Sequence, residues 1–332
     1  MYFCSVNLLA EQIFSITTES NFNEIALQIF KQQAKNCEVY GDYIGHLNIN
    51  PLTIKHYSAI PFLPINFFKS HAITSSNNMP EIIFSSSGTT GQITSKHLVS
   101  DVKIYEQSFN KAFHIFYQNP SETCILALLP SYLEREGSSL IYMVDDLIKQ
   151  SKIAKSGYFL NNLDELFNTL SDLQKSQQKT LLIGVTYALL DFVEQFSINF
   201  PELIVMETGG MKGKRKEMVR DELHQVLGKG FGVENIHSEY GMTELLSQAY
   251  SHGKGIFNCP PWMKILLRDT SDPLSALQTG TSGGINVIDL ANINSCAFIA
   301  TQDLGKTYAN GSFEVIGRFD HADIRGCNLL LQ

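Results

Sequence analysis

Hydrophobic positions near the N-terminus recur at helical spacing. The apolar stripe consists of Phe22, Ile25, Ala26, Ile29 and Phe30. This spacing predicts a helix, and Asn21 with Glu24 is its expected start signal. Pro61 and Pro64 follow in a segment that cannot continue a helix, because proline fixes φ and removes a backbone donor. We therefore expect a helical and then irregular segment over residues 1–80, packed on the domain that follows.

Short apolar runs alternate with helical stripes along the middle of the chain. The expected strands are Ile82–Ser85, Cys124–Leu129, Thr180–Ile183 and Leu203–Met206. The expected helices lie around Tyr105–Phe116, Leu140–Ile148, Leu163–Leu170, Leu189–Phe196 and Met218–Leu227. Strands that alternate with helices predict βαβ units and a mainly parallel sheet, with ligands at the carboxyl ends of the strands.

After about residue 245 the pattern changes to short strands separated by glycine-rich turns. These strands are expected at Lys264–Leu267, Gly284–Ile288, Ala297–Ala300 and Phe313–Ile316. The pattern predicts an α/β core over residues 81–316, with a smaller β-rich portion after residue 245. Residues 317–332 remain as a short tail.

Composition narrows the class of protein. The chain has 332 residues, of which 44% are hydrophobic and 17% charged, so a sizeable core is available and global disorder is excluded. The net charge of −8 argues against a nucleic-acid partner. The six cysteines form no CxxC pair or metal-ligand spacing, which is typical of a reducing compartment. No signal peptide and no membrane span are expected from the apolar runs, so we expect a soluble cytoplasmic protein.

The segment from Phe84 to His97 holds the most informative chemistry. Its serine and threonine hydroxyls and its backbone N–H groups can donate several hydrogen bonds to phosphate oxygens, and Gly88 and Gly91 allow a close approach. Lys96 adds positive charge. The segment does not match a Walker A loop. A flexible loop would explain the composition alone, but the fixed string Ser-Gly-Thr-Thr-Gly favours phosphate binding.

This string resembles the phosphate loop of the adenylate-forming enzymes, the superfamily of acyl-CoA ligases, peptide-synthetase adenylation domains and luciferases. Other segments resemble the motifs of that superfamily in the same order, over roughly residues 80–327. They are Glu207–Gly210, Tyr240–Glu244, Thr301–Asp303 and Gly317–Asp320. The resemblance implies the large N-terminal domain of these enzymes, which is a layered α/β fold with mainly parallel sheets and a smaller β-rich portion.

Within the superfamily, three segments resemble the LuxE-type acyl-protein synthetases of bacterial fatty-acid reductase systems. These segments are Ile60–Lys69, Pro130–Ser139 and Asp323–Cys327. The resemblance implies an acid–thiol ligase that activates a long-chain fatty acid with ATP and Mg²⁺ as an acyl adenylate. Such an enzyme then takes the acyl group onto its own cysteine and passes it to a partner acyl reductase or acyl carrier.

The resemblance also implies roles for individual residues. The phosphate-binding set is Ser85, Ser86, Ser87, Gly88, Thr89, Thr90 and Gly91, with Lys96. The other nucleotide-binding residues are Gly209, Gly210, Tyr240, Gly241, Thr243, Asp303 and Arg318. Among them, Tyr240 would lie against adenine and Thr243 would contact the α-phosphate. Asp303 and Arg318 would take the ribose hydroxyls. Glu244 would bind Mg²⁺, and Cys327 would accept the acyl group.

Several of these residues have a simpler structural alternative. Tyr240 could be a core tyrosine, and Glu244 a solvated carboxylate at the start of a helix. Asp303 could be a turn residue, since Gln302 replaces the glycine that is usual in the superfamily. The basic run over residues 212–216 is typical of a solvated helix face.

The same holds for the remaining candidates. Arg318 could pair with Glu314 or Asp320 on the surface. Cys327 could be a buried cysteine that acts as a small hydrophobic residue. His97, beside Lys96, is expected to be a loop histidine rather than a catalytic base.

Two other functions stay open. Enzymes of the superfamily carry a further lid domain of about a hundred residues after their hinge motif, which Gly317–Asp320 resembles. This lid domain holds a lysine that assists adenylation. About a dozen residues follow Asp320, so that lysine is expected to have no counterpart. The alternatives are a non-catalytic nucleotide- or acyl-binding subunit of a reductase complex, and an acyl-CoA ligase resembling phenylacetate-CoA ligase. Thr243 and Glu244 favour an enzyme, because a binding scaffold needs no metal ligand beside phosphate.

Overall fold

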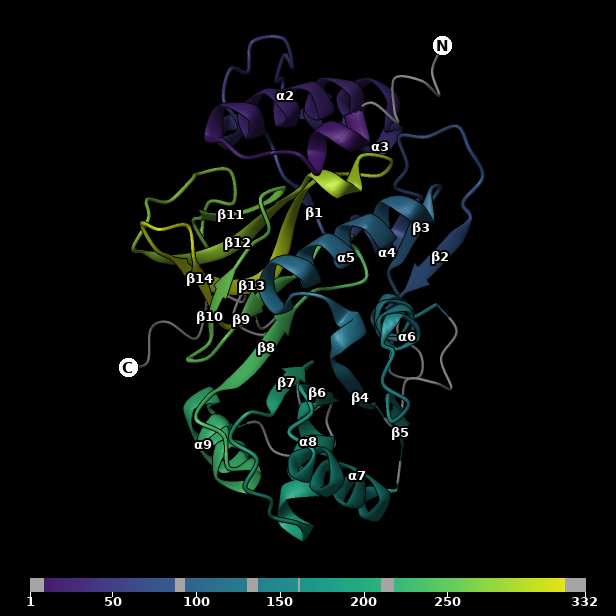
Figure 1. The fold of residues 1–332 in the computed structure, drawn as a ribbon. Helices are drawn as coiled ribbons and strands as arrows, with labels where there is room; N and C mark the ends of the chain where they lie inside the picture. The colour runs from purple at the N-terminus through teal and green to yellow at the C-terminus, as the bar shows by residue number, and fades with distance from the viewer. Residues whose placement is uncertain (1–8, 87–92, 130–136, 161, 210–217, 320–332) are drawn as a thin grey trace, which may run out of the picture. The chain divides into compact units, whose positions relative to one another are not determined.

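The computed structural model describes residues 9–86, 93–129, 137–160, 162–209 and 218–319. The chain forms two compact units (Figure 1). The first, here called the central unit, is Asn77–Pro260. The second, the terminal unit, is built from Met1–Ser76 together with Pro261–Gln332.

A mainly parallel sheet forms the core of the central unit. Its strands follow the order β5 (Gly157–Phe159), β4 (Cys124–Leu128), β6 (Thr180–Val185), β7 (Ile204–Thr208) and β8 (Ile236–Tyr240), and then β9 (Ala249–Ser251) and β10 (Ile256–Asn258). The first five run parallel, and β9 and β10 are added antiparallel. Strands β4 and β6 are buried along their whole length, as expected for strands that are covered on both faces.

Helices cover both faces of this sheet. They are α5 (Val102–Tyr117), the short η2 (Pro120–Glu122), α6 (Ser139–Gln150), α7 (Leu163–Lys175), α8 (Thr186–Gln195) and α9 (Arg220–Phe231). The chain passes from β4 to β5 through α6 and returns past β4 to β6 through α7. Right-handed connections therefore place α6 on one face and α7, α8 and α9 on the other, where Figure 1 shows these three together. The direction of crossing reverses between β4 and β6, and ligands bind at the carboxyl ends of strands at such a reversal.

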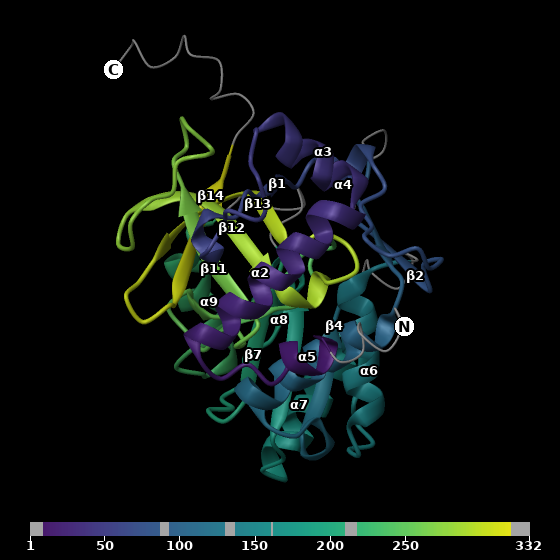
Figure 2. The ribbon, with the colours of Figure 1, turned by 90° about the horizontal axis from the view of Figure 1, so that it is seen from above.

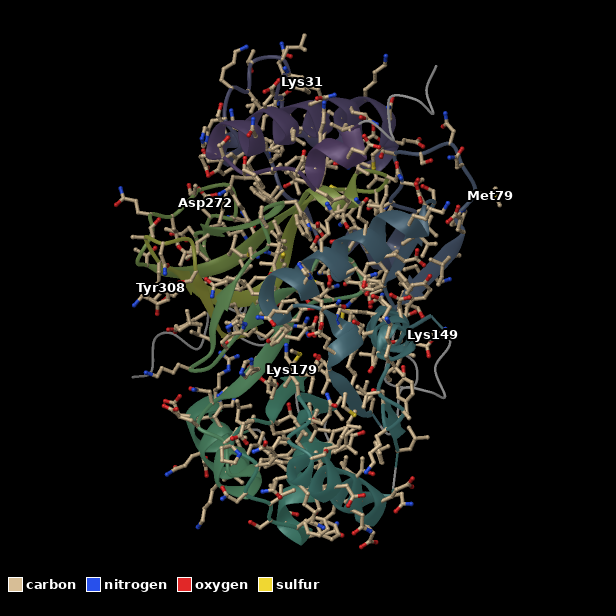
Figure 3. All side chains as sticks on the ribbon, viewed as in Figure 1. Lys31, Met79, Lys149, Lys179, Asp272 and Tyr308 are labelled. Carbon is tan, nitrogen blue, oxygen red and sulfur yellow. The ribbon has the colours of Figure 1, made fainter. Side chains whose placement is uncertain are left out.

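The helices are amphipathic, which explains their placement. In α7, Leu166, Leu170 and Leu173 are buried at helical spacing. Charged residues occupy the opposite faces, such as Lys149 of α6 and Lys31 in the terminal unit, both labelled in Figure 3.

A separate antiparallel hairpin precedes α5 in the central unit. It pairs β2 (Ile82–Ser85) with β3 (Lys96–Val99), so that Ser85 lies opposite Lys96 and Phe84 lies opposite His97. The hairpin holds both ends of the glycine-rich loop.

The terminal unit is an antiparallel sheet with helices from the start of the chain. Its strands are β11 (Met263–Arg268), β12 (Ser282–Asp289), β13 (Phe298–Thr307) and β14 (Phe313–Arg318) in that order, with β1 (Leu63–Pro64) parallel to β13. Its helices are α2 (Glu19–Asn36), α3 (Glu38–His46), η1 (Tyr57–Ala59), α4 (Phe67–Ser70) and η3 (Leu290–Asn292). Helix α2 packs against the start of β13, where the rings of Phe30 and Phe298 meet edge-on at 5.9 Å between centroids (Figure 2).

A buried glutamine joins the two ends of the terminal unit. Gln33 of α2 is fully buried, and its Nε2 donates to the carbonyls of Asn292 at 2.8 Å and Ile293 at 3.1 Å. The Ala297 N–H donates to Gln33 Oε1 at 2.9 Å. One side chain thus bonds to three buried backbone groups. The two carbonyls also accept from Ser295 and Ser75, so it is the Ala297 N–H that depends on Gln33.

The structure confirms the expected alternation of strands and helices and changes several details. The first long helix begins at Glu19, because Thr18 rather than Asn21 is its N-cap and accepts the Asn21 N–H. Strand β8 was not expected, since Ile-His-Ser-Glu-Tyr contains no apolar run. Strand β13 is ten residues long and continues through Gln302 and Asp303, well beyond the expected Ala297–Ala300.

We expect Gln33→Leu to lower the free energy of unfolding by about 2 kcal/mol, because it roughly keeps the volume and leaves the buried Ala297 N–H without its acceptor. The matched control is Gln32→Leu, at a partly exposed position of the same helix, which should change stability by about 0.5 kcal/mol or less. Denaturant unfolding measures both variants. Equal effects would mean that the hydrogen bonds of Gln33 add no stability.

Candidate functional site

Polar residues of the central unit gather where the parallel strands β7 and β8 end. Thr208 lies opposite Glu239 in this pair, so Gly209 and Tyr240 follow at the same edge of the sheet. Gly209 has φ of +61°, a left-handed conformation that glycine adopts without a steric penalty. Gly210 lies outside the described residues. Two of the segments that the sequence singled out are thereby brought together.

A carboxyl group lies partly buried at this edge. Thr208 Oγ1 donates to Glu239 Oε2 at 2.7 Å. Burial raises the pKa of Glu239 to about 7, and the Glu207 carboxylate adds to the rise while the Thr208 hydrogen bond opposes it. Glu239 was not among the residues expected from the sequence. Its only local signal is its position directly before the Tyr240–Glu244 segment.

Tyr240 and Gly241 are fixed by their neighbours. The Tyr240 side chain is 9% exposed, and its ring meets Phe257 edge-on at 6.0 Å between centroids. A Cβ on Gly241 would lie 2.3 Å from Glu239 Oε1, so only glycine fits here without moving the carboxyl. Tyr240 is therefore packed against Phe257, as expected if it is a core tyrosine. It is also the last residue of β8, three residues before Thr243.

Glu244 does not lie on a solvated helix start. It is 6% exposed and sits in a turn in which the Leu245 N–H donates to the Met242 carbonyl at 3.1 Å. Thr243, the preceding residue, is partly exposed. A carboxylate that is largely removed from water is stabilised by partners or by a bound cation.

Backbone hydrogen bonds hold the stem of the glycine-rich loop. Ser86 N–H donates to the Ser95 carbonyl at 3.0 Å, and Ser95 N–H donates to Ser86 Oγ at 2.9 Å. Ser85 N–H donates to the Gly137 carbonyl at 2.8 Å, which joins the stem to the segment before α6. Lys96 is exposed on β3. The expected phosphate ligands Ser87, Gly88, Thr89, Thr90 and Gly91 lie outside the described residues.

His97 joins this stem to the turn that carries Glu244. It lies on β3 and not on a loop, it is 1% exposed, and its Nδ1 is 3.0 Å from the Thr243 carbonyl oxygen. Burial lowers the pKa of His97 to about 4, and the hydrogen bond to Thr243 opposes this. The ring is therefore neutral near pH 7. The expectation of a loop histidine was wrong, because β3 continues through this position.

In the terminal unit, Asp303 and Arg318 form a pair. They are partners in the β13–β14 ladder, and Arg318 Nε lies 3.2 Å from Asp303 Oδ1. The Asp303 side chain is 12% exposed and that of Arg318 is 71% exposed. Asp303 is in a strand and not in a turn. Its neighbour Thr301 is held by Arg268, which donates to the Thr301 carbonyl and was missed by the sequence analysis.

The cysteines that the structure describes differ in burial. Cys37, Cys124 and Cys296 are buried, and burial raises the pKa of each thiol. They are therefore poor nucleophiles. Cys259 is partly exposed. Cys327 and the basic run over residues 212–216 lie outside the described residues.

Two features are absent from the described residues. No group of three or more His, Cys, Asp or Glu side chains is arranged to hold a metal ion. No helix of this part of the chain is both long and apolar enough to cross a membrane.

The chain has the fold of the N-terminal domain of the adenylate-forming ligases. A crystal structure of 2-hydroxyisobutyryl-CoA ligase in complex with 2-HIB-AMP and CoA is similar with a TM-score of 0.69 and 10% identity, over 92% of this chain and 72% of that one. A crystal structure of ATP-bound MatB from Rhodopseudomonas palustris is similar with a TM-score of 0.53 and 17% identity, over 71% of this chain and 47% of that one. The chain thus matches about half the length of MatB.

The model of the LuxE acyl-protein synthetase family matches residues 13–332, so the chain belongs to this family. No curated protein matches it significantly.

We expect Glu239→Gln to change how stability depends on pH. The pKa of Glu239 is raised in the folded protein, so the wild type loses stability as the pH rises from about 4.5 to about 7. Glutamine stays neutral. The free energy of unfolding of the variant, relative to that of the wild type, should therefore rise by roughly 1–3 kcal/mol between pH 5 and pH 8. Thermal unfolding at pH 5, 6.5 and 8 measures this.

The control is Glu234→Gln, at an exposed position five residues earlier. It should show a difference from the wild type that barely changes with pH. If Glu239→Gln behaved in the same way, the carboxyl would not hold a proton near neutral pH.

Proposed function

We propose that this protein activates a long-chain fatty acid with ATP as an acyl adenylate and then transfers the acyl group to a cysteine thiol. The observation that carries the proposal is the joining of three segments in the central unit. The Gly209 turn and the Tyr240–Glu244 segment follow neighbouring strands, and His97 ties the stem of the glycine-rich loop to Thr243. Membership of the acyl-protein synthetase family supports the same chemistry.

The first step is an in-line displacement at phosphorus. A carboxylate oxygen of the acid attacks the α-phosphorus of ATP, the bond to the bridging oxygen breaks, and pyrophosphate leaves. Because charge is redistributed over phosphate oxygens, donors and positive groups placed in advance contribute most to catalysis. Lys96 supplies a positive charge. Ser85 and Ser86 supply hydroxyl donors, and the loop residues 87–91 supply hydroxyl and N–H donors.

The other roles follow the motifs. Thr243 contacts the α-phosphate, Tyr240 lies along adenine, and Gly209 lets the backbone come close to the nucleotide. Asp303 and Arg318 contact the ribose hydroxyls. In this proposal the aspartate accepts from a hydroxyl while it keeps its pair with the arginine, since a carboxylate has several acceptor sites.

Glu244 is a suitable ligand for Mg²⁺. In nucleotide sites Mg²⁺ is usually bound through one or two carboxylates, together with phosphate oxygens and waters, so a cluster of three protein ligands is not required. When bound, Mg²⁺ would neutralise part of the phosphate charge. Glu244 is 6% exposed and precedes the buried Leu245, so its carboxylate is held in place rather than free in solvent.

The second step passes the acyl group to sulfur. A thiolate attacks the carbonyl carbon of the mixed anhydride, the carbon–oxygen bond to phosphate breaks, and AMP leaves. We propose Cys327 as this thiol. The buried Cys37, Cys124 and Cys296 are unfavourable because their raised pKa values keep them protonated. A partner acyl reductase or acyl carrier would then receive the acyl group.

We expect the purified protein to release pyrophosphate with Mg²⁺-ATP and a long-chain fatty acid. Glu244→Gln should lower the rate about 100-fold, because an amide is a poorer ligand for Mg²⁺ than a carboxylate. The exposed Glu234→Gln is the control. Coupled pyrophosphate detection over aliphatic and aromatic acids, with a reductase partner included, measures the rates.

No release under any of these conditions would favour a non-catalytic binding subunit. Full activity in Glu244→Gln together with a large drop in melting temperature would assign Glu244 a purely structural role. Release that requires CoA as the acceptor would favour an acyl-CoA ligase.

We expect radiolabelled fatty acid and ATP to give a hydroxylamine-sensitive protein adduct that Cys327→Ser abolishes while pyrophosphate release continues. A thioester is cleaved by hydroxylamine, whereas serine is not activated in the same way. The control is Cys259→Ser, at the partly exposed cysteine of the central unit, which should keep the adduct. An adduct of unchanged yield in Cys327→Ser would reject this acceptor.

A further inference from the structure

Strand β3 turns two consecutive residues in opposite directions. Lys96 is exposed and His97 is buried, as expected from the period-two alternation of a strand. Both lie at the point where the chain leaves the glycine-rich loop, opposite Ser85 and Phe84 of β2. The proposed function uses the exposed lysine as a phosphate ligand, and it cites the hydrogen bond of the buried histidine without assigning the ring a role in the reaction.

The hydrogen bond of His97 fixes which ring nitrogen carries the hydrogen. Its Nδ1 is 3.0 Å from the carbonyl oxygen of Thr243, which lies 146 residues further along the chain. A carbonyl oxygen can only accept. The Nδ1 of His97 is therefore the donor, and the ring is held as one tautomer.

This bond acts on the peptide that carries Glu244. The Thr243 carbonyl and the Glu244 N–H lie in one plane, because the peptide bond is planar. Holding the carbonyl oxygen therefore sets the direction in which the Glu244 Cα leaves the turn. The segment is a turn rather than a helix or strand, so no regular ladder fixes this plane.

We infer that His97 is a positioning residue. Its Nδ1–H holds the Thr243–Glu244 peptide at a fixed position relative to β3, the strand that carries Lys96. The expected lysine, hydroxyl and carboxylate ligands of a nucleoside triphosphate are then presented as one rigid set. The inference deepens the proposed function and rests on it for the identity of the ligand. The hydrogen bond itself is independent of that function.

Two substitutions of similar polarity separate positioning from simple packing. In His97→Asn the amide nitrogen lies close to the place of Nδ1, whereas in His97→Gln it lies closer to the place of Nε2. Glutamine matches the volume of histidine better. A packing role therefore favours His97→Gln, and a positioning role favours His97→Asn.

We expect His97→Asn to keep kcat/KM for Mg²⁺-ATP within about 3-fold of the wild type and His97→Gln to lose about 10- to 100-fold. The loss should appear mainly in KM for ATP if the ligand set only binds, and in kcat as well if it orients the α-phosphate. Hydrogen–deuterium exchange of the peptide over residues 240–248, without ligand, should be faster in His97→Gln and close to wild type in His97→Asn.

The exchange measurement keeps the two proposals apart. If the wild type releases no pyrophosphate, the proposed function fails, and exchange still decides the role of His97. Equal exchange in both variants, or slower exchange in His97→Gln than in His97→Asn, would overturn the inference. Should either variant fold poorly, ¹⁵N NMR of the wild-type imidazole decides the matter. A hydrogen on Nδ1 supports the inference, and a hydrogen on Nε2 alone contradicts it.

Discussion

The parallel pairing of β7 with β8 is the constraint on which the candidate site depends. Two parallel neighbours end at the same edge of a sheet, so residues 31 positions apart, Thr208 and Glu239, meet there and share a hydrogen bond. The strands between α6 on one face and α7–α9 on the other are largely apolar, which leaves the carboxyl ends as the place where polar groups can gather. The Gly209 turn and the Tyr240–Glu244 segment inherit their positions from this pairing.

Two carboxyl groups within six residues have different surroundings and therefore different uses. Glu239 is flanked by Glu207 and Thr208, and burial raises its pKa to about 7. In the proposed function, its protonated form would add no repulsion toward the phosphates. Glu244 lies in a turn beyond the strand, next to the partly exposed Thr243, where a carboxylate can meet a cation. Glu239 thus has the surroundings of a structural acid, whereas Glu244 has those of the proposed Mg²⁺ ligand.

Much of the fold could be predicted, because apolar stripes at helical spacing and apolar runs are local signals. The helix of Leu166 and Leu170 and the strand Thr180–Val185 are examples. Strand β8 escaped prediction since its burial comes from neighbouring strands and not from its own hydrophobicity. The motifs mark Glu244 and Asp303 as candidates from the sequence alone. The contact between His97 and Thr243 depends on which distant segments become neighbours, and Arg268 has no local pattern that marks its contact with Thr301.

The attachment of Gln33 to the backbone around Asn292 has a consequence for the order of folding during synthesis. The two residues are 259 positions apart, so this contact of the terminal unit cannot form until the chain as far as Asn292 has left the ribosome. Until then, α2 presents the apolar stripe of Phe22, Ile29 and Phe30 without its native cover, while the contiguous residues 77–260 already have the strands and helices of their own sheet. The nascent chain thus carries its earliest hydrophobic surface the longest, and this surface is open to non-native contacts until the strands of the terminal unit are made.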